Sequence, residues 1–322
     1  MSETYAYAVA RVRALEVGLL TNALIDQLIA CRDYPASIQF LTEKGWGDSD
    51  TPLEAEAILG REEEKIWEVV KELAVDKEYF KVLSYPKLFH NLKAAIKEIC
   101  TEEKHPHLFY DDAEIPGDTM LELIREKEFF KLPAVMQKCA QEAFETLLHT
   151  RDGQLCDIII DRAALDAVYE AGKSSNEKII KDYAESVVAV ADIRIAVRAA
   201  KTGKTLDFLK RALAPCESIS VDALAKAAGS GVDSLREYLS GTAYAEGAQA
   251  LMVSPSAFER WCDNRVIETI KPQKYQSFTI GPVIAYVIAR QNEIKTVRIV
   301  LSGKQNMLSE ESIRERVREM YV

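Results

Sequence analysis

Apolar residues recur at helical spacing through most of the chain, and the alternation that marks a half-buried strand is nowhere sustained. One such segment begins at Ala55, and its apolar stripe is formed by Ile66, Val69, Val70 and Leu73. The letters "DTPLE" come directly before it. Threonine followed by proline, with glutamate three residues after the threonine, is typical of a helix N-terminus and makes Thr51 the predicted cap. The pattern therefore predicts an all-α fold.

The content of turn-forming residues supports this prediction. Glycine and proline number 14 and 10 in 322 residues, well below the roughly 12% of average usage. Hydrophobic residues make up 48% of the chain and charged residues 29%, as in an ordinary soluble globular protein. A chain of this length can bury one large core or a few smaller ones, so it needs neither disulfides nor a structural metal.

A motif recurs three times at a spacing of about one hundred residues. It reads NLKAAIK at 91–97, DIRIAVR at 192–198 and NEIKTVR at 292–298. Asn or Asp leads each copy, Ala or Thr and then Val or Ile follow, and Lys or Arg closes it. The second and third copies continue to Gly-Lys pairs at 203–204 and 303–304. A constant period of this kind is typical of repeated structural units.

We therefore expect three related helical modules, with limits near 1–115, 116–220 and 221–322. An insertion between the first two copies, from Thr101 to Lys131, would explain why the first copy aligns less well, and the details of module one near Thr101 are left open. No Gly/Ser-rich linker separates the modules, so they are predicted to pack against one another.

The two Gly-Lys pairs raise the question of a phosphate-binding loop. Such a loop requires another glycine where this chain has Arg198 and Arg298, and the third copy has Gln305 where a magnesium-binding Ser or Thr is needed. Both glycines are instead predicted to end a helix in the left-handed conformation, with lysines near the negative helix terminus. Direct nucleotide binding is therefore not expected.

No constellation of side chains for catalysis, cofactor binding or metal binding stands out. One stretch, TEEKHPHLFYDD, gathers potential ligands: Glu102, Glu103, His105, His107, Asp111 and Asp112. This spacing is a poor template for zinc, and a solvated loop is the preferred interpretation. The six cysteines include no C-x-x-C pair and are predicted to be reduced thiols with a structural role. The sequence thus predicts no catalytic residue, no cofactor and no metal ligand.

Hydropathy and charge narrow the possible partners. The longest apolar run, Phe278 to Ala289, is shorter than the roughly 20 residues of a membrane span, and no secretory signal pattern is visible, so a cytoplasmic protein without a transmembrane segment is expected.

A net charge of −10 argues against binding to nucleic acid or to anionic lipid. The segment from Arg265 onward differs, with ten Lys and Arg against six Glu. An ion-paired helix face is the first interpretation, and a docking surface for an acidic partner is the second.

The chain is predicted to end in a helix capped by Ser309. Glu310 and Glu311 suit its positive start. Three arginines follow towards its negative end: Arg314, Arg316 and Arg318. Its apolar face is predicted to pack against the last module and contains Ile313, Val317 and Met320 or Tyr321.

Two terminal segments resemble a known family. YAYAVARVRALEVGLLTNALIDQLI at 5–29 and EIKTVRIVLSGKQNMLSEESIRERVREMYV at 293–322 are similar to the C-type subunit of V-type and archaeal A-type ATPases and ATP synthases, whose counterpart in vacuolar enzymes is the d-type subunit. The threefold repeat and the length agree with that family. The resemblance implies a funnel-shaped all-α protein in which three quasi-equivalent modules surround a central cavity.

The resemblance also implies a function, that of a non-catalytic rotor adapter. Such a protein, expected as one copy per complex, lies on the cytoplasmic face of the membrane rotor ring of proteolipids and receives the base of the central stalk. It passes torque between ATP hydrolysis or synthesis and the transport of protons or sodium ions. Both the ion and the direction are left open, because the ion-binding carboxylate belongs to the ring. As a hypothesis, the basic C-terminal part contacts an acidic surface of the assembly.

Two other classes of protein stay open from the residues themselves. One is a helical-repeat scaffold unrelated to rotary ATPases. The other is a helical enzyme that uses a carboxylate cluster formed by Glu102, Glu103, Asp111 and Asp112.

Overall fold

The protein is described by a computed structural model that covers residues 5–104 and 106–322, and no strand occurs among these residues. The predicted all-α class is confirmed. The chain forms two compact units, which are described separately below. Unit 1 combines the described residues up to Asp76 with Tyr244–Val322, and unit 2 comprises Lys77–Ala243.

Unit 1 is built around one long helix, α15 (Gly281–Gln305). The other helices of unit 1 are α1 (Ala6–Glu16), α2 (Asn22–Ala30), α3 (Tyr34–Glu43), α4 (Ala55–Glu72), α13 (Ala245–Val253), α14 (Pro255–Glu268), the 3-10 helix η4 (Lys271–Tyr275) and α16 (Glu310–Arg314). α15 contacts helices from both ends of the chain, including α1, α3, α4 and α14. Since its first turns carry the long apolar run, they can be buried on every side. In the part of the chain that the structure describes, no helix combines the length and hydropathy needed to span a membrane.

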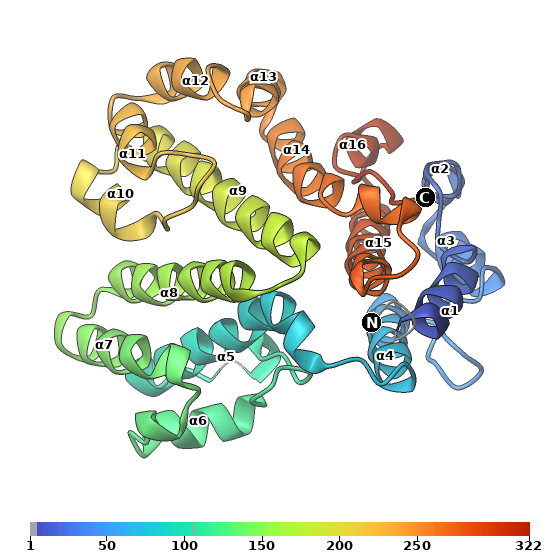
Figure 1. The fold of residues 1–322 in the computed structure, drawn as a ribbon, viewed down its shortest axis with the longest axis horizontal. Helices are drawn as coiled ribbons and strands as arrows, with labels where there is room; N and C mark the ends of the chain where they lie inside the picture. The colour runs from blue at the N-terminus through green and yellow to red at the C-terminus, as the bar shows by residue number, and fades with distance from the viewer. Residues whose placement is uncertain (1–4, 105) are drawn as a thin grey trace. The chain divides into compact units, whose positions relative to one another are not determined.

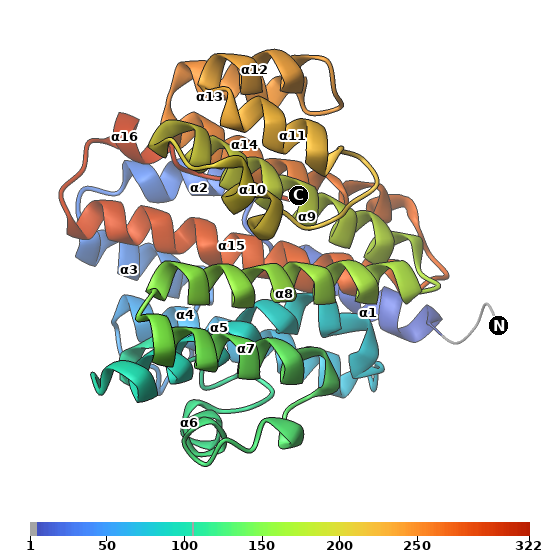
Figure 2. The same cartoon turned by 90° about the vertical axis from the view of Figure 1, so that its left-hand side faces the viewer.

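Unit 2 is a stack of helices with α8 (Gly153–Ser174) at its centre. Its other helices are η1 (Lys77–Phe80), α5 (Lys81–Thr101), η2 (Pro106–Leu108), α6 (Gly117–Arg125), η3 (Phe129–Lys131), α7 (Ala134–Thr150), α9 (Lys178–Thr202), α10 (Leu206–Ala212), α11 (Val221–Gly229) and α12 (Val232–Ser240). α8 contacts α5 and α7 on one side and α9 on the other (Figure 1). Figure 2 shows α7 and α8 running side by side along their length.

The three copies of the repeated motif each lie inside a long helix, in α5, α9 and α15. The leading residue is buried in every copy, as Asn91, Asp192 and Asn292. Each leading side chain forms a hydrogen bond with the backbone of the segment that follows its helix, at Tyr110 and Ile115, at Ala214, and at Glu319 respectively. The repeated polar position therefore ties each long helix to the chain that returns over it.

The two repeated glycines have different roles. Gly203 ends α9 with a φ of +63°, as predicted for a left-handed cap. The same prediction for Gly303 is wrong, because α15 continues to Gln305 and the left-handed residue after it is Met307, with a φ of +54°. A Cβ at Gly303 would lie 2.6 Å from Cγ1 of Ile313 in α16. Gly303 therefore permits a close approach of α16 to α15.

The predicted start of α4 is also wrong. Thr51 does not cap the helix, because its hydroxyl donates to Oδ1 of Asp48 at 2.6 Å within the preceding loop. The helix begins at Ala55 instead. The N–H of Ala55 donates to the hydroxyl oxygen of Tyr34 at 2.9 Å, so a tertiary contact takes the place of the local cap.

The C-terminal helix is shorter than predicted. Ser309 caps it by accepting from the N–H of Ser312 at 3.2 Å, as expected, but α16 ends at Arg314. Asparagine side chains from other helices bind the backbone of the extended tail at Glu319 and Met320: Asn22, Asn264 and Asn292. Ile313, Met320 and Tyr321 are buried, but Val317 of the predicted apolar face is only half-buried, and the residues after Arg314 do not continue the helix.

Candidate functional site

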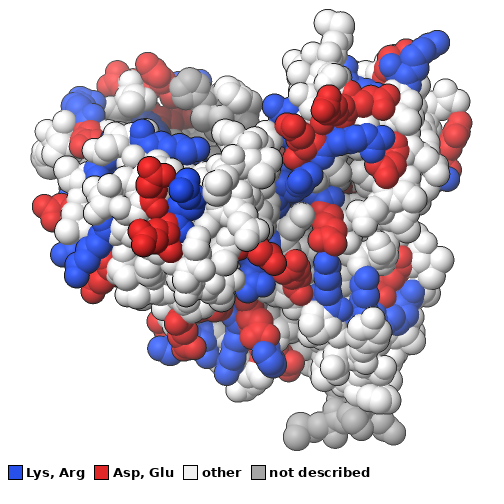
Figure 3. Space-filling view, turned by 90° about the horizontal axis from the view of Figure 1, so that it is seen from above, with Lys and Arg blue, Asp and Glu red and all other residues white. Residues whose placement is uncertain are grey.

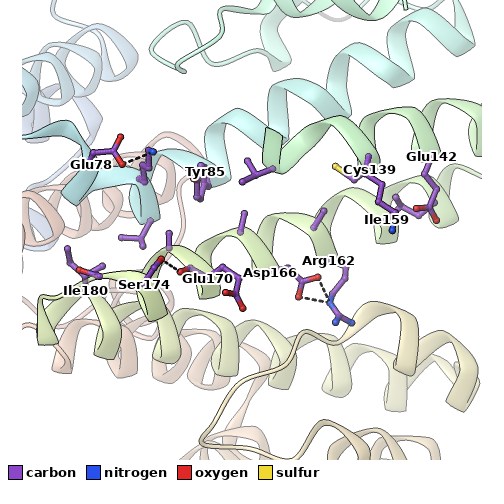
Figure 4. Close-up of a pocket in the computed structure, with 18 of the residues that line it drawn as sticks. Glu78, Tyr85, Cys139, Glu142, Ile159, Arg162, Asp166, Glu170, Ser174 and Ile180 are labelled. Carbon is purple, nitrogen blue, oxygen red and sulfur yellow. Dashed lines mark hydrogen bonds and ion pairs between the residues drawn. The ribbon is translucent and has the colours of Figure 1, made fainter. Parts of the chain in front are cut away.

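A groove of about 970 Å³ runs along α8 in unit 2 (Figure 4). Its walls come from η1 and the first turns of α5 and α7 on one side, and from the start of α9 and the end of α10 on the other. Ala163, Ala167 and Ala171 of α8 line it one helical turn apart. Since alanine side chains are short, this face of α8 leaves a hollow that longer side chains would fill.

Charged side chains line the groove, and several of them pair with one another. Nε of Arg162 lies 2.9 and 3.0 Å from the two carboxylate oxygens of Asp166. Arg162 also donates to the backbone carbonyl of Leu213, which links the groove to the segment after α10. Towards the other end, Lys81 lies 2.7 Å from Glu78 (Figure 4). These two ion pairs neutralise four of the charged groups, so the groove presents a mixed apolar and polar surface.

The nucleophilic groups of the groove are not activated. Burial raises the pKa of the Cys139 thiol to about 12, which keeps it protonated near neutral pH. Burial also raises the pKa of Tyr85. The Ser174 hydroxyl donates to the carbonyl of Glu170 within the same helix. No described histidine lines the groove, so its described residues include no imidazole base for Ser174 or Cys139. The arrangement is suited to binding through shape and paired charge.

Unit 1 contains a buried cluster of charges at its centre. Arg290 of α15 is 7% exposed and pairs with Glu62 of α4 and with Glu293. The carboxylates accept further hydrogen bonds from backbone N–H groups, Glu62 from Gly47 at 2.8 Å and Glu293 from Leu20.

Other groups complete the environment of this cluster. Lys65 lies 2.6 Å from Glu62, and the guanidinium carbon of Arg290 lies 5.3 Å from the centre of the Trp46 ring. Burial raises the pKa of Glu293. Because its charges are mutually compensated and enclosed, we interpret the cluster as a tie between α4 and α15 rather than as a ligand site.

The acidic and histidine-containing stretch from Glu102 to Asp112 does not converge on one site. Glu102 ends α5 in the left-handed conformation, Asp112 pairs with Lys87, and His105 lies outside the described residues. Glu103 and Asp111 are exposed. Among the residues that the structure describes, no three His, Cys, Asp or Glu side chains are grouped in a way that could hold a metal ion. The carboxylates proposed for a helical enzyme are absent from the lining of the groove.

The lysines of the two Gly-Lys pairs form hydrogen bonds within the protein, and most of the cysteines are buried. Nζ of Lys204 donates to Gln154 at 2.9 Å, and Nζ of Lys304 donates to the carbonyl of Cys31 at 2.6 Å. Both lysines thus bind groups of their own unit. All six cysteines are free, and four of them are buried: Cys100, Cys139, Cys156 and Cys262.

The basic side chains of the C-terminal part have partners within unit 1. Arg314 pairs with Asp26, Arg298 with Glu56, and Arg318 with Asp263 at 2.6 Å. The other seven basic residues from Arg265 onward also contact acidic, aromatic or carbonyl groups of this unit: Arg265, Lys271, Lys274, Arg290, Lys295, Lys304 and Arg316. On the face shown in Figure 3, basic and acidic side chains are intermingled. The ion-paired helix face of the first interpretation is thus present only in part, because most of these pairs join different elements of unit 1 rather than neighbouring turns of one helix.

The buried acids Glu62, Glu293 and Asp192 were not identified from the sequence, and of these Asp192 in α9 has no ion-pair partner among the described residues. Its side chain is fully buried, and its Oδ1 accepts from the N–H of Ala214 at 2.9 Å. Burial is the main cause that raises its pKa to about 8. The signal in the sequence was the repeat itself, since Asp192 stands where the other two copies have asparagine.

The fold defines an all-helical class of protein, and its unit 2 contains the groove along α8. Residues 8–316 match the protein family described as ATP synthase (C/AC39) subunit. The chain therefore belongs to this family, as its terminal segments suggested. A scaffold unrelated to rotary ATPases is ruled out by the same finding.

Two relatives are similar to this chain along most of their length. The C-type subunit of the V-type sodium ATPase of Enterococcus hirae is 23% identical over 270 residues, which cover 83% of this chain and 82% of the relative. The C-type subunit of the A-type ATP synthase of Methanocaldococcus jannaschii is 21% identical over 340 aligned positions, which cover 96% of this chain and 85% of the relative.

Proposed function

We propose that this protein is the non-catalytic rotor adapter of a V-type ATPase or ATP synthase. It links the central stalk to the membrane rotor ring on the cytoplasmic side, as one copy per complex, and transmits torque between them. The observation that carries the proposal is the family match from residue 8 to residue 316, together with relatives that are named as components of rotary enzymes. The three-module funnel with a central cavity is part of the same proposal.

The packing of each unit supports a mechanical role. An element that carries torque has to resist deformation, and closely packed interiors transmit strain because they have low compressibility. In unit 1, α15 is surrounded by helices from both ends of the chain and joined to α4 by the buried cluster. In unit 2, α8 is held between α5, α7 and α9. The buried ties at Asn91, Asp192 and Asn292 fix the segments that follow the long helices.

The proposal leaves open whether the complex transports protons or sodium ions. One relative is named as part of a sodium ATPase and the other as part of an ATP synthase, so the two names differ in direction, and only the first names an ion. We propose that the adapter serves either ion, because it holds the ring from outside the membrane.

Co-purification from membranes tests the proposed function. The full-length protein, carrying an affinity tag and expressed in its own cells, would be purified from membranes solubilised in mild detergent. We expect the proteolipid of the ring and the central-stalk proteins to be identified by mass spectrometry at stoichiometric amounts. Recovery of the protein alone, or with partners unrelated to a rotary ATPase, would contradict the proposal.

A charge swap tests whether the C-terminal arginines contact an acidic partner. Reversal of Arg314, Arg316 and Arg318 to Glu should weaken assembly, but it also breaks internal ion pairs such as Arg314 with Asp26. The double variant Arg314→Glu with Asp26→Arg keeps an internal pair and reverses the outward charge. If Arg314 contacts a partner, the double variant stays defective in co-purification. Full recovery would show that only the internal pair matters.

A further inference from the structure

Asp192 is the least compensated buried charge-bearing group of unit 2. It lies in the middle of α9 with a relative exposure of 0%. Oδ1 accepts one hydrogen bond, from the N–H of Ala214, whereas Oδ2 has no hydrogen-bond partner among the described residues. A fully buried carboxylate with one hydrogen bond is costly, because burial removes the water that stabilises its charge.

The segment that Asp192 holds is fixed at several other points. Glu185, two turns earlier on α9, accepts from the N–H groups of Glu217 at 3.0 Å and Ser218 at 2.7 Å. Arg162 of α8 donates to the carbonyl of Leu213. Residues 213–218 therefore form a strap over α9, with the Asp192 contact beneath it.

The corresponding positions in the other two copies hold a neutral side chain. The amide of Asn91 both donates, to the carbonyls of Tyr110 and Ile115, and accepts, from the N–H of Tyr110. The amide of Asn292 donates to the carbonyl of Glu319. A neutral carboxylic acid has nearly the shape of an asparagine amide, with one oxygen to accept and an O–H in place of the N–H₂ group. A carboxylate can only accept.

The charged groups near Asp192 do not provide a full counter-charge. Arg162 provides a favourable charge, but its guanidinium already binds Asp166 and the carbonyl of Leu213. Asp166 and Glu185 both disfavour a second negative charge, and Cys216 lies near enough to interact with it. The ionisable side chains of the other helices packed on α9 are exposed or half-exposed: Asp207, Lys210 and Arg211 of α10, Asp222 and Lys226 of α11, and Asp233, Arg236, Glu237 and Tyr238 of α12.

We propose that Asp192 is held as the neutral acid, uncharged like the asparagines of the other two copies, and that its ionisation opens the strap of residues 213–218. Water reaches the new charge only if this strap lifts from α9. The strap is thus a proton-dependent latch in unit 2, independent of whether the protein works as a rotor adapter.

The direction of the pH dependence follows from the raised pKa. The folded-state pKa of about 8 lies above the ordinary value of 3.8, so the folded protein holds the proton more tightly than the unfolded chain does. The stability that this proton provides is complete below pH 3.8 and is lost as the pH rises towards 8. Above that range Asp192 is ionised in both the folded and the unfolded protein, and no further loss of stability is expected from this group.

The variant Asp192→Asn tests the proposal, because it supplies the neutral side chain at every pH. Thermal unfolding of the full-length wild type and of this variant would be compared between pH 4.5 and 9. We expect the variant to gain in Tm relative to the wild type as the pH rises, by several degrees at pH 8, with a constant difference above that. A difference in Tm that does not change with pH, or a variant less stable than the wild type at pH 8, would overturn the proposal.

Two controls make the result specific. Asp207→Asn removes an exposed carboxylate from the same unit and should follow the pH profile of the wild type. Asn91→Asp places an acid at the equivalent position of the first copy and should create a new loss of Tm with rising pH.

Amide hydrogen exchange, corrected for the intrinsic rate at each pH, should show that residues 213–218 lose protection between pH 7 and 9 in the wild type and keep it in Asp192→Asn. Equal protection in both proteins at pH 9 would overturn the latch.

Discussion

The two units bury ionisable groups in different ways. Unit 1 encloses Arg290 with two glutamates, and the remaining carboxylate oxygens are bound by backbone N–H groups and by Lys65. Unit 2 encloses a single carboxyl group, Asp192, with one hydrogen bond. A charge can stay ionised in the interior when partners surround it, whereas an acid without them binds a proton. The free-energy cost of burying a charged group is thus offset by ion pairing in unit 1 and avoided by protonation in unit 2.

The compensated cluster also joins distant parts of the sequence. Glu62 and Arg290 are separated by 228 positions in the chain, and they bring α4 and α15 into one unit. The N-terminal and C-terminal segments of unit 1 are therefore fixed to each other by a contact that neither segment could make alone. The buried carboxyl of unit 2 instead acts over a shorter range, from α9 to the segment that directly follows α10.

The largest effect is expected from Arg290→Met, which leaves Glu293 buried without a counter-charge and Glu62 with Lys65 alone. We expect the free energy of unfolding of unit 1 to fall by about 3–5 kcal/mol, measured by chemical denaturation. Arg298→Met on the same helix is the matched control, since Arg298 pairs with Glu56 of the same helix α4 but is exposed, and its loss should cost below about 1 kcal/mol. Similar losses for both variants would show that the buried cluster is not the tie that the comparison requires.

A smaller difference in the free energy of unfolding is expected between alanine substitutions at the repeated asparagines of the two units. Asn91→Ala in unit 2 removes three hydrogen bonds at a fully buried position and leaves backbone groups of Tyr110 and Ile115 without partners. We expect a loss of about 3 kcal/mol. Asn292→Ala in unit 1 removes one hydrogen bond, to Glu319, and should cost about 1–2 kcal/mol. Thermal unfolding of both variants would measure this order, and the reverse order would mean that the repeated position does not work as a backbone tie.

Several features of the fold could be predicted from local sequence. The helical spacing of apolar residues gave the all-α class, and the constant period placed the three motifs inside long helices. The Ser309 cap and the Gly203 cap were also correct, because each depends on residues only a few positions away. The period alone did not show that the leading asparagine or aspartate holds a returning segment.

The incorrect predictions share a physical cause, which is a tertiary contact that overrides a local preference. Thr51 does not cap α4, because its hydroxyl donates to Asp48 in the preceding loop. The hydroxyl oxygen of Tyr34 instead accepts from the first N–H of the helix. The C-terminal helix stopped at Arg314 because asparagines of other helices bind the backbone beyond it. The groove along α8 has no signature in the sequence, since it results from short side chains opposite walls that come from other helices.

The glycines of the repeat give the most detailed comparison between the units. Gly303→Ala brings a Cβ against Ile313, and we expect a loss of about 1–3 kcal/mol in the free energy of unfolding. Gly203→Ala meets no neighbouring atom within 4 Å but has a φ of +63°, so strain alone should cost about 1 kcal/mol.

A second substitution separates these two causes. In an Ile313→Ala background, Gly303→Ala should become neutral or stabilising by up to about 1 kcal/mol, because alanine is the better helix former once the clash is gone. Gly203→Ala should cost the same in either background, since it lies in the other unit. If the cost of Gly303→Ala also stays the same without the isoleucine side chain, Gly303 has a conformational role after all, and the two glycines are equivalent as the sequence alone suggested.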